Sequence, residues 1–310
     1  MTTKFNEWSL QWLHSMRGTV KDNTYYSSYK IPVERHLNPV FQDTPLSKIS
    51  SIDIQNYFAE RYDIFSLETL KKDKHCLKRI FTSAQCNGLC NINPVLDIKL
   101  KHNNSLNEME IYTPKEVELI YAYAEYHRYG DEIYTMLETG MRRGELLALK
   151  WDDIDFARKT ISIKRAVSDC IDSESGKYKR IIDIPKNEYS IRTMPISSSL
   201  CNVLLRRKAM GHCEFVFPNQ YGNVCSPRNW SRRHYDVFMR DMQNFYKQQD
   251  IYINTYSPHA LRHTRASIWV NNGLNLYAIS KILGHSDLQM LRKRYAHSNV
   301  DEIRRLMNII

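Results

Sequence analysis

The spacing of apolar residues is the feature that most limits how this chain can fold. The spacing is helical along most of the sequence and changes to a period of two only between residues 160 and 196. There the segments TISIKRA, YKRIIDIP and SIRTMPI alternate between apolar and polar residues, which is typical of short antiparallel strands. The pattern therefore predicts a mainly α-helical chain with one small antiparallel β-sheet.

A polar stretch with little periodicity divides the chain. A length of 310 residues is more than one ordinary small domain needs, so we expect two domains. The segment KLKHNNSLNE has the composition of a linker. We predict a helical domain over residues 1–98, a linker over 99–108, and a domain of helices and strands over 109–310.

Capping residues and one proline predict where individual helices begin or change direction. Ser50 is followed three residues later by Asp53, which is a capping-box pattern. Thr113 can cap a helix whose first residue is Pro114. Pro32 lies inside a helical pattern and should bend or split that helix.

Composition points to a globular protein with a polyanionic partner. The 42% hydrophobic content supports buried cores, and the net charge of +10 favours nucleic acid first and an anionic membrane surface second. No apolar run approaches the roughly 18 residues that a membrane helix needs. The N-terminus lacks the pattern of a signal peptide, so we expect a cytoplasmic protein.

Cysteine and histidine spacing gives little support for a metal site. The seven cysteines are odd in number and scattered, so we expect reduced thiols. Cys86 and Cys90 lie four residues apart, but no second pair with zinc-ligand spacing follows. His259 and His263 form an i, i+4 pair without a third ligand nearby. We predict no bound metal and no cofactor.

The segment TGMRRGELLALKW places two arginines at the start of an apolar helix. Gly140 can end the preceding helix, and a new helix should start near Met141. Helical spacing puts Arg142 on the same side as Leu146, where a guanidinium is costly unless an anion or a carboxylate meets it. Two readings remain open here: an internal ion pair with Glu145, or an anion-binding site.

Three later segments add reactive side chains. SPHALRHTRAS places His259 and Arg262 one turn apart on a capped helix, and GHSDLQMLRKRYAH places His285 ten residues before Tyr295. IPKNEYSIRT puts Lys186 at a tight turn between strands. Each segment alone is weak, since the chain has 20 tyrosines and a single one usually fills a core.

Together and in this order, these segments resemble the tyrosine recombinases, the phage integrase family. The resemblance covers residues 109–310 as the catalytic unit. Through NTYYSSYKIPVERHLNPVF and SIDIQNYF, residues 1–98 resemble that family's helical core-binding domain. The resemblance implies a SAM-like helical domain and a mixed α/β catalytic domain that close on double-stranded DNA as a C-shaped clamp.

The resemblance also assigns roles to the reactive residues. Arg142 and Arg262 would hold the non-bridging oxygens of a DNA phosphate, supported by the helix N-terminus at Arg142, so that no metal ion or ATP is needed. Tyr295 would attack the phosphorus and form a 3′-phosphotyrosyl intermediate.

The remaining roles follow from the same resemblance. Lys186 would be the general acid for the departing 5′-hydroxyl, and His259 would assist proton transfer at the nucleophile. His285 would hydrogen-bond the phosphate, and Glu145 would orient the arginines. Further candidates for contact with DNA are the basic residues Arg143, Lys71, Lys74, Lys78, Arg292, Lys293 and Arg294.

The resemblance implies an assembly on DNA and leaves several outcomes open. Family members act as four protomers on two sites, and an accessory DNA-bending or directionality factor is a further expected partner. The segment DEIRRLMNII either packs on a neighbouring protomer or closes its own core.

The outcome of the reaction also stays open. An integrase of a mobile element fits best. A Xer-type resolvase or a DNA invertase remains open because the core-binding helices start almost at Met1, without an arm-binding domain before them. A type IB topoisomerase or a non-catalytic DNA-binding protein is a weaker alternative. The complete set of reactive positions argues against lost catalysis.

Overall fold

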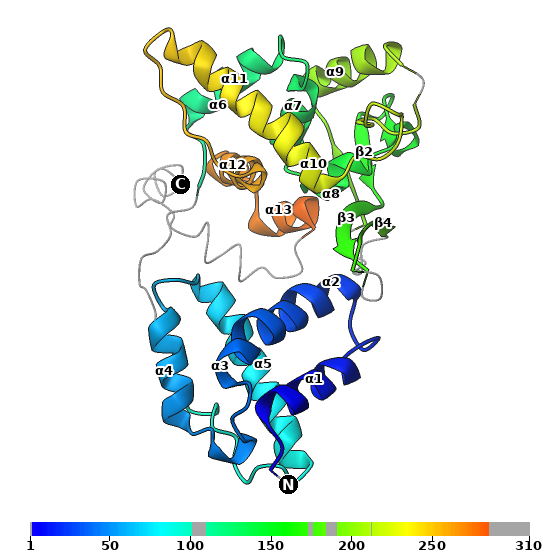
Figure 1. The fold of residues 1–310 in the computed structure, drawn as a ribbon. Coiled ribbons are helices and arrows are strands. Elements are labelled where there is room, and N and C mark those ends of the chain that lie inside the picture. The colour runs from blue at the N-terminus through cyan, green and yellow to red at the C-terminus, as the bar shows by residue number, and fades with distance from the viewer. Residues whose placement is uncertain (1, 101–109, 173–175, 184–190, 212, 285–310) are drawn as a thin grey trace, which may run out of the picture. The chain divides into compact units, whose positions relative to one another are not determined.

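The computed structural model describes residues 2–100, 110–172, 176–183, 191–211 and 213–284. The chain forms two compact units (Figure 1). One contains Met1–Leu106 together with Cys170–Lys179, and the other contains Asn107–Asp169 with Arg180–Ile310. Most of the predicted linker over 99–108 lies outside the described residues.

The first unit is built mainly from helices. In chain order they are α1 (Phe5–Ser15), α2 (Asp22–Tyr25), the π-helical segments η1 (Tyr26–Lys30) and η2 (Pro32–Leu37), α3 (Asn38–Phe41), the 3-10 turn η3 (Leu46–Lys48), α4 (Ser51–Arg61) and α5 (Leu67–Cys86). Apolar residues at helical spacing meet in one core. Its fully buried members include Phe5, Val33, Leu37, Ile54, Leu77, Ile80 and Phe81.

Pro32 changes the hydrogen bonding of the helical run from α2 to α3 without ending it. The two π-helical segments lie on either side of Ile31, which precedes the proline. Proline has no N–H to donate and its ring crowds the carbonyl four residues earlier, so a wider turn accommodates it. The expected split thus takes the form of π-helical segments within a continuous helical run.

A buried carboxylate joins three helices of this unit. Asp73 on α5 is completely buried, and it accepts a hydrogen bond of 2.8 Å from the Tyr57 hydroxyl on α4. Its other oxygen lies 2.8 Å from Nδ1 of His36 on η2. Burial raises the pKa of Asp73, while the bonds from His36 and Tyr57 act in the opposite direction. The polar triad satisfies its own hydrogen bonds and so fits within the helical core.

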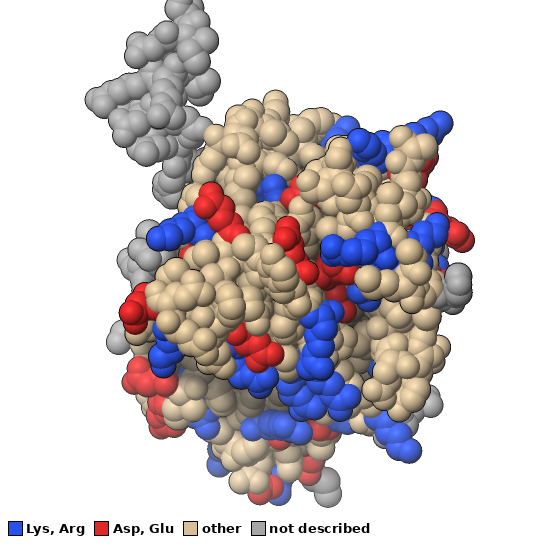
Figure 2. All heavy atoms as spheres, turned by 90° about the horizontal axis from the view of Figure 1, so that it is seen from above, with Lys and Arg blue, Asp and Glu red and all other residues tan. Residues whose placement is uncertain are grey.

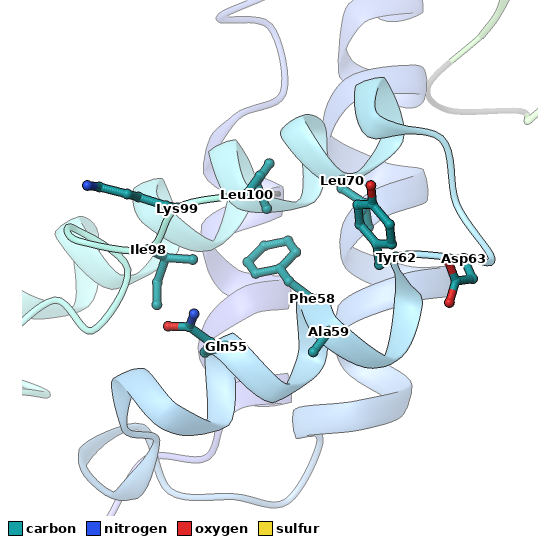
Figure 3. A pocket seen from close by; sticks show the side chains of 9 residues that line it. All are labelled: Gln55, Phe58, Ala59, Tyr62, Asp63, Leu70, Ile98, Lys99 and Leu100. Carbon is teal, nitrogen blue, oxygen red and sulfur yellow. The ribbon is translucent and has the colours of Figure 1, made fainter. Parts of the chain in front are cut away.

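The first unit also contains an apolar cavity of about 290 Å³ (Figure 3). Phe58 and Ala59 on α4 face Ile98 and Leu100 across it, with Leu70 at one side. None of the predicted reactive residues lines this cavity.

The second unit combines helices with short strands. Its helices are α6 (Pro114–Ala124), α7 (Gly130–Thr139), α8 (Arg143–Leu147), α9 (Ser198–Ala209), α10 (Pro227–Trp230), α11 (Asp236–Lys247), α12 (Pro258–Asn271) and α13 (Leu276–Leu283), with the 3-10 turn η4 (Trp151–Asp153) and the π-helical segment η6 (Ser231–Tyr235). Its strands are β1 (Ile154–Asp155), β2 (Thr160–Ile163) and β5 (Arg192–Pro195), together with most of β3 (Ala166–Ile171) and β4 (Tyr178–Asp183), whose adjoining ends fall in the segment Cys170–Lys179 of the first unit.

The strands in the described residues form two sheets where the sequence predicts one. β2 pairs antiparallel with both β1 and β5, so that Ile161 lies opposite Ile154 on one side and Met194 on the other. β3 and β4 pair with each other in a separate sheet. Alternation predicts that a segment is extended, but the choice of pairing partner depends on contacts across the fold. The mainly helical fold class is confirmed, and the single sheet is wrong.

The predicted caps are present. The Ser50 hydroxyl accepts from the backbone N–H of Asp53, and the Asp53 carboxylate accepts from the backbone N–H of Ser50 at 2.8 Å. Thr113 and Glu116 form the same reciprocal pair at the start of α6. None of the seven cysteines forms a disulfide in the structure. Within the described part of the chain, no helix combines the length and apolarity needed to span a bilayer.

Helix α8 approaches strand β3 closely through a glycine. A Cβ atom built on Gly144 would lie 2.4 Å from the carbonyl oxygen of Val167. No real Cβ contact is that short, so any larger residue must push α8 away from β3. The position of α8, which follows Arg142 directly, depends on this contact.

We predict that Gly144→Ala lowers the free energy of unfolding by about 1–3 kcal/mol because of this overlap. Chemical denaturation of wild type and variant measures the difference. Gly211→Ala is the matched control, since a Cβ there meets no atom within 4 Å. Equal stability of the two alanine variants would contradict the close contact.

Candidate active site

The turn between α7 and α8 sets the position of Arg142. Gly140 ends α7 in the left-handed conformation with φ 62°, as the sequence predicts. Arg142 is extended and caps α8, which begins at Arg143. The predicted start near Met141 is therefore two residues early, because the left-handed glycine and the extended Arg142 cannot belong to an α-helix. Met141 itself is completely buried and anchors the turn.

Glu145 binds Arg142 in two ways. Its carboxylate accepts from the backbone N–H of Arg142 at 2.8 Å and from Nη1 of the same residue at 2.9 Å. The Arg142 side chain is 39% exposed, so its guanidinium is held by the carboxylate and still reaches solvent. The ion pair that the sequence leaves open is present, and it leaves an exposed cation at the helix start.

A second arginine, Arg192 on β5, meets the same carboxylate. Its Nη1 and Nη2 donate to the two oxygens of Glu145 at 3.0 and 2.8 Å, which is a bidentate pair. Burial by itself raises the pKa of Glu145. The hydrogen bonds and charge of Arg192, with the charges of Arg142 and Arg262, outweigh burial and lower that pKa to about 2. Glu145 is therefore ionised at neutral pH.

Arg262 comes from α12 and is almost completely buried, with 1% exposure. Its Nη1 donates to the carbonyl of Gly140 at 2.8 Å, and its Nη2 donates to the carbonyl of Leu283 at 2.6 Å. Arg142 donates to the next carbonyl along, that of Gly284, at 3.2 Å. The structure thus brings both predicted clamp arginines to the same two segments, the turn after α7 and the end of α13.

His259 lies in the first turn of α12, one turn before Arg262. It is exposed, and its ring packs edge-on against the partly buried His263 with 4.5 Å between centroids. In the part of the chain that the structure describes, no group of three or more His, Cys, Asp or Glu side chains is arranged to hold a metal ion. His259 lies one turn before the predicted clamp residue Arg262 on the same helix.

Part of the predicted site lies outside the described residues. These are the predicted general acid, the second histidine, the nucleophile and the basic residues before it: Lys186, His285, Tyr295, Arg292, Lys293 and Arg294.

Three of the other four predicted DNA contacts have partners within the protein. Arg143 is half-buried and donates to the Ser231 hydroxyl, and its burial lowers the pKa of the guanidinium. Lys71 pairs with Glu68 at 2.6 Å, and Lys74 donates to the carbonyl of Ile98. Lys78 is exposed.

On the face that Figure 2 shows, charge does not by itself mark a binding surface. Lys and Arg side chains lie there in several groups among Asp and Glu side chains.

Sequence reasoning missed Arg192. The alternation of SIRTMPI contains the signal, because it places Arg192 in phase with Met194 on the buried side of β5. An arginine in a buried phase requires a carboxylate partner, and Glu145 is that partner. The sequence does not show which carboxylate it would be.

We predict that the stabilising effect of Glu145 disappears in acid. Its pKa is lowered from 4.5 to about 2 in the folded chain. The effect is therefore fully present above about pH 4.5 and is lost as the pH falls toward 2; it is on the order of 3 kcal/mol. The measurement is the difference in unfolding free energy between wild type and Glu145→Gln from pH 7 to pH 3. A difference independent of pH would contradict the assignment.

Comparison with known proteins places the site in context. Residues 110–302 match the model of the phage integrase family, and residues 4–62 match the phage integrase N-terminal SAM-like domain. A XerC-like tyrosine recombinase of Caldanaerobacter subterraneus is 30% identical and aligns over 81% of this chain and 68% of its own length. The transposase of transposon Tn916 from Enterococcus faecalis is 28% identical, over 76% of this chain and 60% of its own length.

Solved structures share the fold. The integrase of transposon Tn1549 in complex with a circular intermediate DNA superposes with a TM-score of 0.79 at 23% identity, covering 98% of each chain. A lambda integrase tetramer bound to a Holliday junction superposes with a TM-score of 0.67 at 17% identity, covering 92% of this chain and 78% of that one.

Proposed function

The chain belongs to the phage integrase family, and from this premise we propose that it is a site-specific DNA recombinase that cleaves and rejoins DNA strands through Tyr295. The relatives named above are a tyrosine recombinase and enzymes of mobile elements, which supports an integrase of a mobile element. One structural observation supports the proposal independently of the similarity to known proteins. It is the convergence of Arg142 and Arg262 on the end of α13.

The two arginines suit a phosphodiester. Their forked donors match the non-bridging oxygens of a phosphate, and negative charge grows on these oxygens as the phosphorus is attacked. Arg142 has the exposed guanidinium, whereas Arg262 is buried beside the turn that precedes it. Arg142 is thus the arginine placed to meet DNA first, and Arg262 supplies a second, desolvated charge behind it.

The reaction we propose retains the energy of the broken phosphodiester bond in a phosphotyrosyl bond. The Tyr295 oxygen forms a bond to phosphorus as the bond from phosphorus to the 5′-oxygen breaks, and Lys186 gives the departing oxygen its proton. His259 assists the removal of the tyrosine proton, and His285 hydrogen-bonds the phosphate. A 5′-hydroxyl from a second strand then reverses the step, so no ATP is needed.

The two parts of the chain would divide the work. We assign DNA binding to residues 1–98 and catalysis to residues 109–310, with residues 99–108 as the linker. The lambda integrase tetramer on a Holliday junction supports an assembly of four copies on two DNA sites. An accessory DNA-bending or directionality protein would set the outcome of recombination. Contacts with phosphates would make the affinity fall steeply with salt.

We predict that the protein forms covalent adducts with DNA and that Tyr295→Phe forms none. Fragmented DNA from the source organism is incubated with each protein, denatured in detergent, and the attached fragments are sequenced. A few related sequences in the wild-type sample would identify the target site. Adducts without sequence preference would indicate a topoisomerase instead. Salt-sensitive binding without adducts in either sample would contradict the proposed activity.

We predict that Arg142→Ala reduces the rate of adduct formation by about 100-fold or more, because one preorganised charge is lost at the phosphate. DNA binding should change little, since many other phosphate contacts contribute to it. Rates and dissociation constants measured on one recovered sequence separate these effects. A variant that binds ten-fold more weakly but reacts at the wild-type rate once bound would place Arg142 in binding alone.

A further inference from the structure

The C-terminal end of α13 collects three arginines. The carbonyls of its last two residues, Ile282 and Leu283, and of the capping Gly284 accept hydrogen bonds from Arg192, Arg262 and Arg142 respectively. The last carbonyls of a helix have no partner within the helix and carry its partial negative charge, so they suit cations. Two of these arginines are the proposed phosphate clamp, and Arg192 is not among the predicted catalytic residues.

Arg192 is buried and hydrogen-bonded within the protein. Its side chain is 5% exposed, and that of its partner Glu145 is 3% exposed. Its two Nη atoms donate to Glu145 and its Nε donates to Ile282. With its donors directed at these internal acceptors, Arg192 acts on the clamp and not on the DNA.

Charge balance gives Arg192 a specific effect on the clamp. A single carboxylate facing Arg142 alone would form a neutral pair and reduce the attraction of that guanidinium for a phosphate. In the structure, Glu145 is shared between Arg142 and Arg192. Arg142, Arg192 and Glu145 together therefore carry one net positive charge, and the nearby Arg262 contributes another.

We propose that Arg192 is a positioning residue for the phosphate clamp. It holds the Glu145 carboxylate in the orientation that directs Arg142, and it keeps that carboxylate from neutralising Arg142. Through Ile282 it also fixes the helix end on which Arg142 and Arg262 rest. This inference rests on the proposed recombinase function and adds a residue to its machinery.

The inference predicts that Arg192 variants react more slowly with a charged phosphodiester while binding DNA as tightly as the wild type. Arg192→Gln should lower the rate of adduct formation by about 10–100-fold, the range typical of supporting residues around a reactive centre. Arg192→Lys should lower this rate by a smaller factor, because a lysine keeps the charge but not the forked geometry. The substrate is a duplex with a recovered cleavage sequence, and the affinity for it should stay at the wild-type level.

A second substrate tests the mechanism. A methylphosphonate at the cleavage position has a methyl group in place of one non-bridging oxygen and carries no charge for the clamp to neutralise. On this substrate, the rates of adduct formation of both Arg192 variants should lie closer to the wild-type rate. A purely structural defect would lower both rates by the same factor.

Arg207 provides the matched control. Its Nε also donates to a backbone carbonyl, that of Val216 at 2.7 Å, and its Nη1 lies 3.4 Å from the carboxylate of Asp131. Among the described residues its polar contacts are with Val216 and Asp131, away from Glu145 and the end of α13, so Arg207→Gln should leave both rates unchanged.

The outcomes separate this inference from the proposed function. Wild-type rates for folded Arg192→Gln, or equal loss on both substrates, would overturn the role of Arg192 while the recombinase function stands. If Arg192→Gln does not fold, Arg192→Lys decides by the same comparison of substrates. No adducts from the wild-type protein would remove the proposed function and this inference with it.

Discussion

A buried carboxylate with two arginines is the interaction on which the rest of the site depends. Glu145 would be costly at 3% exposure without partners, and Arg192 would be equally costly. Their bidentate ion pair compensates both buried charges. The Glu145 carboxylate also accepts hydrogen bonds from the backbone N–H and the side chain of Arg142. The helix that follows Arg142 therefore begins with an oriented cation.

The fold brings distant segments to this carboxylate. β5 supplies Arg192, the turn after α7 supplies Arg142, and α12 supplies Arg262, although these elements are far apart in sequence. The end of α13 unites them, because its free carbonyls are acceptors that only donors from other elements can satisfy. Figure 1 shows α13 next to α12, which lets the two helices share the buried Arg262.

The family and the mainly helical fold were predicted correctly, since the apolar periodicity and the order of reactive segments are local in sequence. The capping residues were also right, because a cap involves side chains only three residues apart. The single sheet was wrong and Arg192 was missed. Strand pairing and the partner of a buried arginine both depend on residues distant in the chain.

The sequence by itself determined which segments are helical, where several helices begin, and which residue types are available for phosphate chemistry. Only the tertiary structure decided that Glu145 binds two arginines and that three arginines donate to successive carbonyls at the end of α13 and its cap. The physical reason is the range of the interactions. Periodicity and capping act within one or two turns, whereas burying a charge requires a partner that only the folded chain can bring close.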